Sequence, residues 1–262
     1  MSNFLVAIEA DLPSSIALRY ACRLALLTQA RVQVIHVKEP EEDGPATGAG
    51  WASQTWRREL LKKASEEITP VLRDDLDHCP GLGEPIVVVG DRETEILAEL
   101  GRRSYGLLVE GLPAPPTPAL LHRKLRSEGL RQSPCPVLLG LTMAPLERAL
   151  VILEGDAGEP ARLERLAGLL GGAPMGLELA TCRFPGQAGE WGQAILDQAR
   201  QTLEGLGIRV AGQQVLKGWP EDLAPITWDY GLVVARMDRE AHRDNPWLTM
   251  LGHCATSMLL CP

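Results

Sequence analysis

The stretch Leu5-Val-Ala-Ile-Glu-Ala-Asp11 decides the fold, because it returns almost unchanged as Leu150-Val-Ile-Leu-Glu-Gly-Asp156, about half a chain later. Two later landmarks recur in the same order. They are Tyr105-Gly-Leu-Leu-Val109 with Tyr230-Gly-Leu-Val-Val234, and Pro134-Cys-Pro136 with Leu260-Cys-Pro262. One folding unit is therefore present twice. We expect a first domain of residues 1–143 and a second domain of residues 147–262.

Each unit alternates short apolar runs with helical patterns. Phe4 to Ile8 is too short for a helix and leads into a turn with Pro13, which suits a first helical turn. Apolar residues at helical spacing follow from Ile16 to Leu27, and a second apolar run lies at Val32 to Val37. Continuous apolar strands that alternate with helices predict an α/β fold. We expect two tandem Rossmann-like domains, each an open parallel β-sheet flanked by helices.

The two units differ at their ends. The first unit has an apolar run at Pro136 to Leu141, which we interpret as its fifth strand. The matching landmark in the second unit, Leu260-Cys-Pro262, is already the end of the sequence. We therefore expect the second sheet to lack a fifth strand. The fifth strand of the first unit would then be free for a homodimer contact, and the open fourth strand of the second would need a cover.

The composition excludes several classes of protein. The 262 residues are 45% hydrophobic and 23% charged, and the net charge of −8 argues against a nucleic-acid partner. No apolar run approaches the roughly 18 residues of a membrane span, and the first apolar run is too short for a signal peptide. The six cysteines lack a CxxC pair or a metal-ligand spacing. We expect reduced thiols in a cytoplasmic protein that has no membrane partner.

Several motifs together resemble one known family. They are the string from Leu5 to Ala21, the strand that ends at His36-Val37, Gly90-Asp91 before a helix, and the ending from Leu130 to Leu139. In this order they resemble the universal stress protein family, over essentially the whole chain and in tandem. The resemblance implies a five-stranded parallel sheet in each unit and a stress-related role.

Many members of that family bind ATP, and the resemblance implies where a site would lie. They use Asp after the first strand, GxxG after the fourth strand, and Gly with Ser or Thr nine residues later. Glycine lets the backbone approach the phosphates, and a helix N-terminus favours their charge. Such ligands bind at the carboxyl ends of the strands.

This chain departs from the family pattern at most of these positions. Glu9 and Glu154 replace Asp, and Ala114 replaces the second glycine in the first unit. Prolines that follow Ala114 remove backbone donors that a phosphate would need. In the second unit Ala235-Arg236-Met237 replaces the start of the glycine loop. The candidates for a residual nucleotide or anion site are Glu9, Val37, Gly111, Arg123 and Lys124.

We therefore predict a non-enzymatic stress-response protein with degenerate nucleotide sites, no cofactor, no catalytic residues and no metal ligands. A homodimer or another protein partner is expected. The alternative is an adenine-nucleotide sensor, or at its extreme a slow ATPase, in which the first domain still takes ATP. His36 is expected as a packed core histidine. For Trp219, Trp228 and Trp247 a place in the core and a partner surface both remain open, with the core as the default.

Overall fold

The computed structural model describes residues 2–40, 51–76, 79, 81–113, 115–186 and 192–262. The elements of the first half are β1 (Asn3–Ala7), α1 (Leu12–Thr28), β2 (Arg31–Lys38), α2 (Trp51–Leu76), β3 (Ile86–Val89), α3 (Arg92–Arg102), β4 (Leu107–Gly111), α4 (Pro118–Leu125), α5 (Glu128–Gln132) and β5 (Val137–Gly140). Those of the second half are β6 (Arg148–Leu153), α6 (Glu159–Leu170), β7 (Gly176–Arg183), α7 (Gly192–Gly205), β8 (Val210–Lys217), α8 (Pro220–Leu223), the 3₁₀ helix η1 (Ala224–Asp229), β9 (Leu232–Arg236), α9 (Pro246–Leu251) and β10 (Met258–Cys261).

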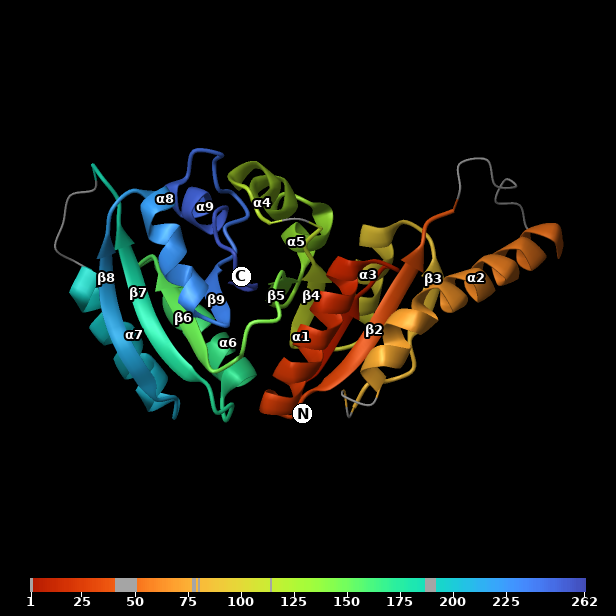
Figure 1. The fold of residues 1–262 in the computed structure, drawn as a ribbon, viewed down its shortest axis with the longest axis horizontal. Helices are drawn as coiled ribbons and strands as arrows, with labels where there is room; N and C mark the ends of the chain where they lie inside the picture. The colour runs from red at the N-terminus through yellow and green to blue at the C-terminus, as the bar shows by residue number, and fades with distance from the viewer. Residues whose placement is uncertain (1, 41–50, 77–78, 80, 114, 187–191) are drawn as a thin grey trace.

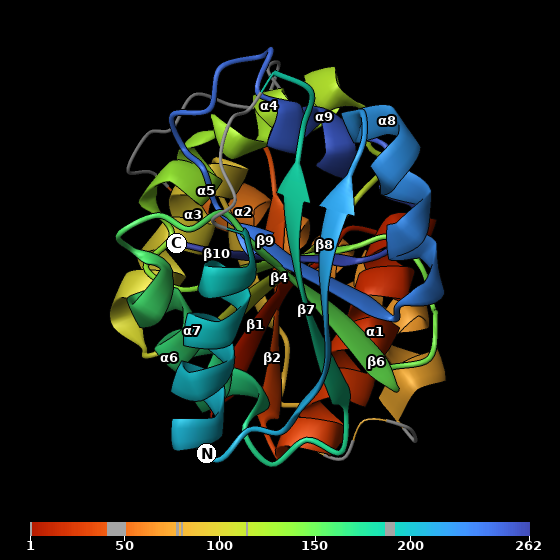
Figure 2. The same ribbon diagram turned by 90° about the vertical axis from the view of Figure 1, so that its left-hand side faces the viewer.

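The strands form one continuous sheet in the order β3-β2-β1-β4-β5-β10-β9-β6-β7-β8. The order within the second half mirrors that within the first, as expected of a repeated unit (Figure 1). Neighbouring strands are parallel except β5 and β10, which pair antiparallel where the two halves meet. The predicted α/β fold, with a large and mostly parallel sheet flanked by helices, is confirmed. Figure 2 shows the sheet from the end formed by β7 and β8.

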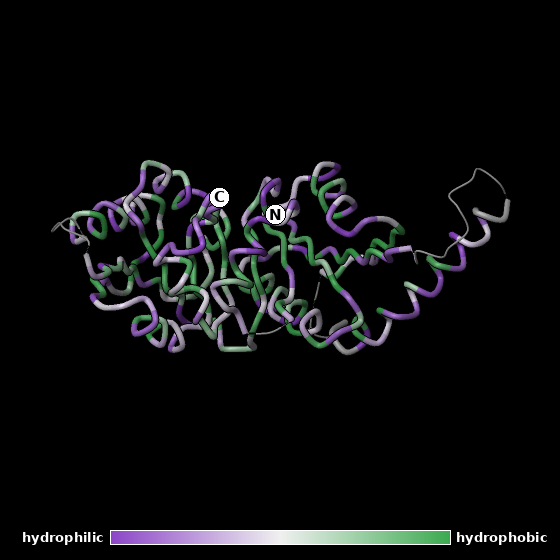
Figure 3. Tube along the Cα trace, turned by 90° about the horizontal axis from the view of Figure 1, so that it is seen from above, coloured by the Kyte–Doolittle hydropathy of each residue, from purple (hydrophilic) through white to green (hydrophobic). Residues whose placement is uncertain are grey.

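The core lies on both faces of the sheet. Side chains alternate along a strand, so Phe4 and Val6 pack in one apolar cluster and Leu5 and Ala7 in the other. Figure 3 shows the hydrophobic colouring concentrated in the central strands, with hydrophilic segments along the outer helices. Because both faces are covered, the strands read as continuous apolar runs. No helix in the described part of the chain is both long enough and apolar enough to cross a membrane.

The start of α1 positions the first residues of the candidate site. Asp11 caps the helix, since its Oδ1 accepts a hydrogen bond from the Ser14 amide at 2.9 Å. Pro13 lies in the first turn, and Ser14 Oγ accepts a hydrogen bond from the Glu9 amide at 2.8 Å. These local bonds hold Glu9 between the end of β1 and the start of α1.

The prediction that the second unit lacks a fifth strand is wrong. β10 is that strand, and it lies between β9 and β5. The error came from aligning Leu260-Cys-Pro262 with Pro134-Cys-Pro136, because the apolar run before Pro262 is itself the fifth strand. Since β10 covers the edges of both β5 and β9, the expected homodimer contact through the first fifth strand is also wrong.

The cysteines also differ from the expectation of reduced thiols. Cys22 in the middle of α1 and Cys79 before β3 form a disulfide, with their Cα atoms 5.1 Å apart. The other four cysteines are free and buried. The two cysteines lie 57 residues apart in the sequence, so no local motif predicted that they would pair.

The three tryptophans of the second unit do not share one environment. Trp247 packs edge-on against Phe184, with ring centroids 5.0 Å apart, and it borders an apolar cluster of the core. Trp219 and Trp228 instead expose more than half of their surface. The default expectation of a core position therefore holds for Trp247 and fails for the other two.

Candidate functional site

The candidate site of the first unit lies where β1 and β4 end. In the parallel pair, Ala7 lies beside Glu110. Glu9 and Glu110 therefore approach the same edge of the sheet, which is the usual ligand position in open α/β sheets.

A network of charged side chains fills this edge. Arg92, the first residue of α3, donates to Glu9 Oε1 through Nε and to Glu110 Oε1 through a terminal nitrogen, both at 2.9 Å. Lys124 from α4 reaches Glu110 Oε2 at 2.5 Å. Glu9 after β1, Arg92 of α3, Glu110 of β4 and Lys124 of α4 thus form one connected network at this edge.

Glu110 is the centre of this network and is only 4% exposed. Burial by itself would raise the pKa of its carboxyl, but the charges and hydrogen bonds of Lys124 and Arg92 lower that pKa below its ordinary value. Glu110 is therefore ionised at neutral pH, and the positive charge of Lys124 is already balanced by a buried partner.

Gly111 serves packing in this structure. A β-carbon on Gly111 would lie 2.4 Å from the carbonyl oxygen of Pro13, so the glycine allows the end of β4 to lie against the start of α1. The next amide, that of Leu112, donates to the carbonyl of Gly140 at 3.0 Å. The Leu112 amide is therefore already paired within the sheet.

The other predicted residues lie apart from the network. Val37 is buried in the apolar core and pairs in register with Val88, and Arg123 is exposed on α4. Ala114 lies outside the described residues. His36 is buried as expected, and its Nδ1 donates to the carbonyl of Ile8 at 2.9 Å.

The structure thus brings Glu9 and Lys124 together, but only through two residues that sequence reasoning missed. Glu110 had a usable signal, since it is a carboxylate directly after the apolar run that ends at Val109. Arg92 follows Gly90-Asp91 and had no signal of its own.

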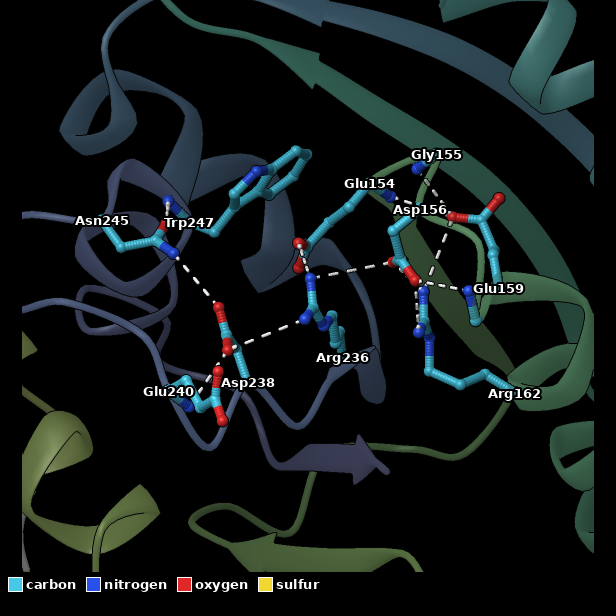
Figure 4. Close-up of polar contacts among 11 residues, drawn as sticks. Glu154, Gly155, Asp156, Glu159, Arg162, Arg236, Asp238, Glu240, Asn245 and Trp247 are labelled. Atoms are coloured by element: carbon cyan, nitrogen blue, oxygen red, sulfur yellow. Dashed lines mark hydrogen bonds and ion pairs between the residues drawn. The ribbon is translucent and has the colours of Figure 1, made fainter.

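In the second unit, a different set of charged side chains lies at the equivalent edge of the sheet. Arg236 ends β9 as Gly111 ends β4, so a long cation stands where the family pattern has glycine. Its guanidinium lies 3.4 Å from Glu154 Oε2, 3.9 Å from an oxygen of Asp156 and 3.8 Å from Asp238 Oδ1 (Figure 4). The first glycine position is therefore occupied by a side chain that binds the Glu154 carboxylate.

A carboxylate of the chain also occupies backbone donors in this unit. Glu159 Oε2 accepts hydrogen bonds from the amides of Glu154 at 3.0 Å and Gly155 at 2.9 Å (Figure 4). Arg162 pairs with Asp156 beside it. These amides at the end of β6 are the kind of group that binds an anion, and Glu159 takes that place.

Crowding of charge makes Glu154 unusual. Its carboxyl has a pKa of about 7, because burial, and to a lesser extent Asp238 and Asp156, raise the pKa more than Arg236 and Arg162 lower it. The neighbouring cavity, which Arg162 and Arg236 border, measures about 20 Å³. That volume suits about one water molecule, whereas ligand pockets measure roughly 300 Å³ or more.

Comparisons with known proteins agree with this fold. The sequence profile described as "Universal stress protein family" matches residues 1–139. A universal stress protein from Archaeoglobus fulgidus DSM 4304 superposes with a TM-score of 0.66 at 14% identity, covering 99% of this chain and 95% of that one. A putative universal stress protein from Pseudomonas aeruginosa UCBPP-PA14 gives 0.57 at 18% identity, covering 100% and 93%. No curated protein matches. Since the family profile covers more than half of the sequence, the chain belongs to the universal stress protein family.

Proposed function

We propose that this protein is a tandem universal stress protein of the cytoplasm that acts without catalysis and without bound ATP. The units are residues 1–143 and 147–262, and the protein works through contacts with a second copy or another protein. One observation carries the proposal. Both expected nucleotide positions are filled by the chain's own charged side chains, with Arg236 in place of a glycine and Lys124 paired to the buried Glu110.

The energetics of the two networks support this reading. A nucleotide in the first unit would have to separate Lys124 and Arg92 from Glu110 or leave that buried carboxylate short of partners, which is costly. In the second unit it would have to displace Arg236 and the Glu159 carboxylate. Either change would make the free energy of nucleotide binding less favourable.

The test is isothermal titration of the purified protein with Mg-ATP at moderate salt, after a check that no nucleotide co-purifies. We expect no saturable heat up to millimolar ATP and no rise in Tm. The matched variant is Arg236→Gly, which restores the family's residue, with Arg200→Gly on the exposed face of α7 as its control. Saturable micromolar binding to the unchanged protein would contradict the proposal.

The second candidate function is an adenine-nucleotide sensor, or a slow ATPase, built on the first unit. Its supporting observation is that Glu9 remains partly exposed at the end of β1 and that Lys124 stands near it through the shared network. Under this hypothesis Lys124→Met abolishes ATP binding and Arg236→Gly leaves it unchanged. The same titration therefore separates the two candidates.

A further inference from the structure

Two tryptophans stand exposed on one short segment of the second unit. Trp219, the N-cap residue of α8, is 62% exposed, and Trp228, within η1, is 57% exposed. The indole of tryptophan is the largest side chain, and tryptophan is enriched in surfaces that bind partner proteins. Two exposed indoles on one short segment therefore indicate a surface that binds a partner.

Both indoles lie on the exposed side of this segment. Trp219 is the N-cap residue of α8, η1 continues directly from α8, and residues three apart eclipse one another in a 3₁₀ helix, which aligns Pro225 with Trp228. Leu223, Ala224 and Thr227 are buried beneath the segment. The exposed residues at intervals of three, which we term the Trp stripe, are Trp219, Asp222, Pro225 and Trp228.

The charges around the stripe all have one sign within the segment. Glu221, Asp222 and Asp229 are exposed, and residues 219–229, all of them described, contain no Lys, Arg or His. Three cations lie close to the segment. Lys217 precedes it by two residues, Arg183 is the register partner of Lys217 on β7, and Arg148 is paired with Glu178, lies over the ring of Tyr230 and interacts with Asp229. The segment thus offers two exposed indoles and three carboxylates, with no cation of its own.

The stripe is also placed where a partner can reach it. It follows β8, which ends the sheet on the side away from the β5–β10 junction. Figure 2 shows α8 beside the upper end of β8, at the outer edge of the molecule. Association of the two units through β5 and β10 leaves this edge uncovered.

We propose that the Trp stripe binds an arginine-rich segment of a partner protein. A guanidinium stacks on an indole face and pairs with a carboxylate at the same time, which suits this combination of groups better than an ammonium would. Negative charge on the stripe disfavours an anionic membrane or nucleic acid as the occupant.

The first test follows the indole N–H signals in a two-dimensional ¹⁵N NMR spectrum while the peptide (Arg-Gly-Ser)₄ is added. The chain has six tryptophans, and we expect two indole signals to shift, assigned by Trp219→Phe and Trp228→Phe. The peptide (Lys-Gly-Ser)₄ should bind more weakly, and (Glu-Gly-Ser)₄ should not bind. Shifts of other indoles alone, or equal binding of the Arg and Lys peptides, would overturn the proposal.

Affinity measurements on variants supply the second test. Trp219→Ala and Trp228→Ala should each weaken the Arg peptide about two- to fivefold, with an unchanged Tm. Leu12→Ala, at an exposed apolar residue of the other unit, should leave the affinity unchanged. Two results would instead assign another occupant and refute the proposal: self-association lost in the Trp variants, or binding to phosphatidylcholine vesicles lost in them.

Discussion

Replacement of Glu154 by glutamine should stabilise this protein at alkaline pH and change little at acidic pH. Glu154 is largely buried beside Asp156 and Asp238, with Arg236 as its cationic partner at 3.4 Å. Burial raises the pKa of its carboxyl from the ordinary 4.5 to about 7. A raised carboxyl pKa means that the folded state holds the proton more tightly than the unfolded state. The ionised group therefore lowers the stability once the pH exceeds 4.5, and the loss is complete above about pH 7.

The magnitude follows from the same pKa. One pKa unit corresponds to about 1.4 kcal/mol, so ionised Glu154 costs about 3 kcal/mol at pH 8 and about 1 kcal/mol at pH 5. Glutamine has nearly the same shape as the protonated acid and carries no charge. Glu154→Gln should therefore exceed the unchanged protein in free energy of unfolding by about 3 kcal/mol at pH 8.

Urea unfolding of both proteins at pH 5, 6, 7 and 8 measures this difference, and the titration of all other groups cancels in the comparison. Glu204→Gln is the matched control, because Glu204 pairs with Arg200 on an exposed helix face and should matter by less than about 0.5 kcal/mol at each pH. If Glu154→Gln were less stable than the unchanged protein at pH 8, the Arg236 ion pair would outweigh the burial of charge. That result would refute the reasoning.

Three further predictions concern the first unit. Lys124→Met should lower the unfolding free energy by about 3 kcal/mol at pH 7, because Glu110 loses a partner. The cost should shrink at acidic pH. The pKa of Glu110 is lower in the folded than in the unfolded protein, so its ionised form stabilises the fold above the ordinary pKa, and this stabilisation is lost as the pH falls through the pKa of the folded state. An equal cost at pH 3 and pH 7 in urea unfolding would contradict this prediction. Gly111→Ala should cost about 1–3 kcal/mol by overpacking against Pro13, whereas Gly101→Ala, which meets open space, should not destabilise; thermal unfolding of the pair decides. Cys79→Ala should lower stability by up to about 4 kcal/mol, as a closed loop of 57 residues implies, and the difference should vanish in reductant; no difference without reductant would mean that the thiols are free.

Much of the fold was accessible from short stretches of sequence. The apolar run around Phe4 to Ile8 and the helical pattern after Pro13 act locally, so β1 and α1 could be predicted from their own residues. The sequence also showed Arg236 in place of the first glycine in the second unit, and Glu9 in place of the Asp of the family pattern. An error arose where two similar landmarks, Pro134-Cys-Pro136 and Leu260-Cys-Pro262, were matched by their letters, because burial rather than residue identity makes a strand.

The candidate site was predictable only in part, for a related reason. Glu9 and Lys124 were identified from the family pattern. Arg92, which joins Glu9 to Glu110, lies 83 residues after Glu9 along the chain. No periodicity or propensity specifies which cation will meet a buried carboxylate when several are available. The outcome depends on which helices pack over the end of each strand.

The repeat and its alternation of strands and helices thus followed from local sequence alone, because φ/ψ preference and side-chain period act over a few residues. The tertiary structure decided which distant parts meet. It paired β5 with β10 into one sheet, joined Cys22 to Cys79, brought Lys124 to Glu110 and Arg236 to Glu154, and left Trp219 and Trp228 exposed. Such contacts depend on packing and charge burial between elements far apart in the sequence, and these become defined only when the elements have packed together.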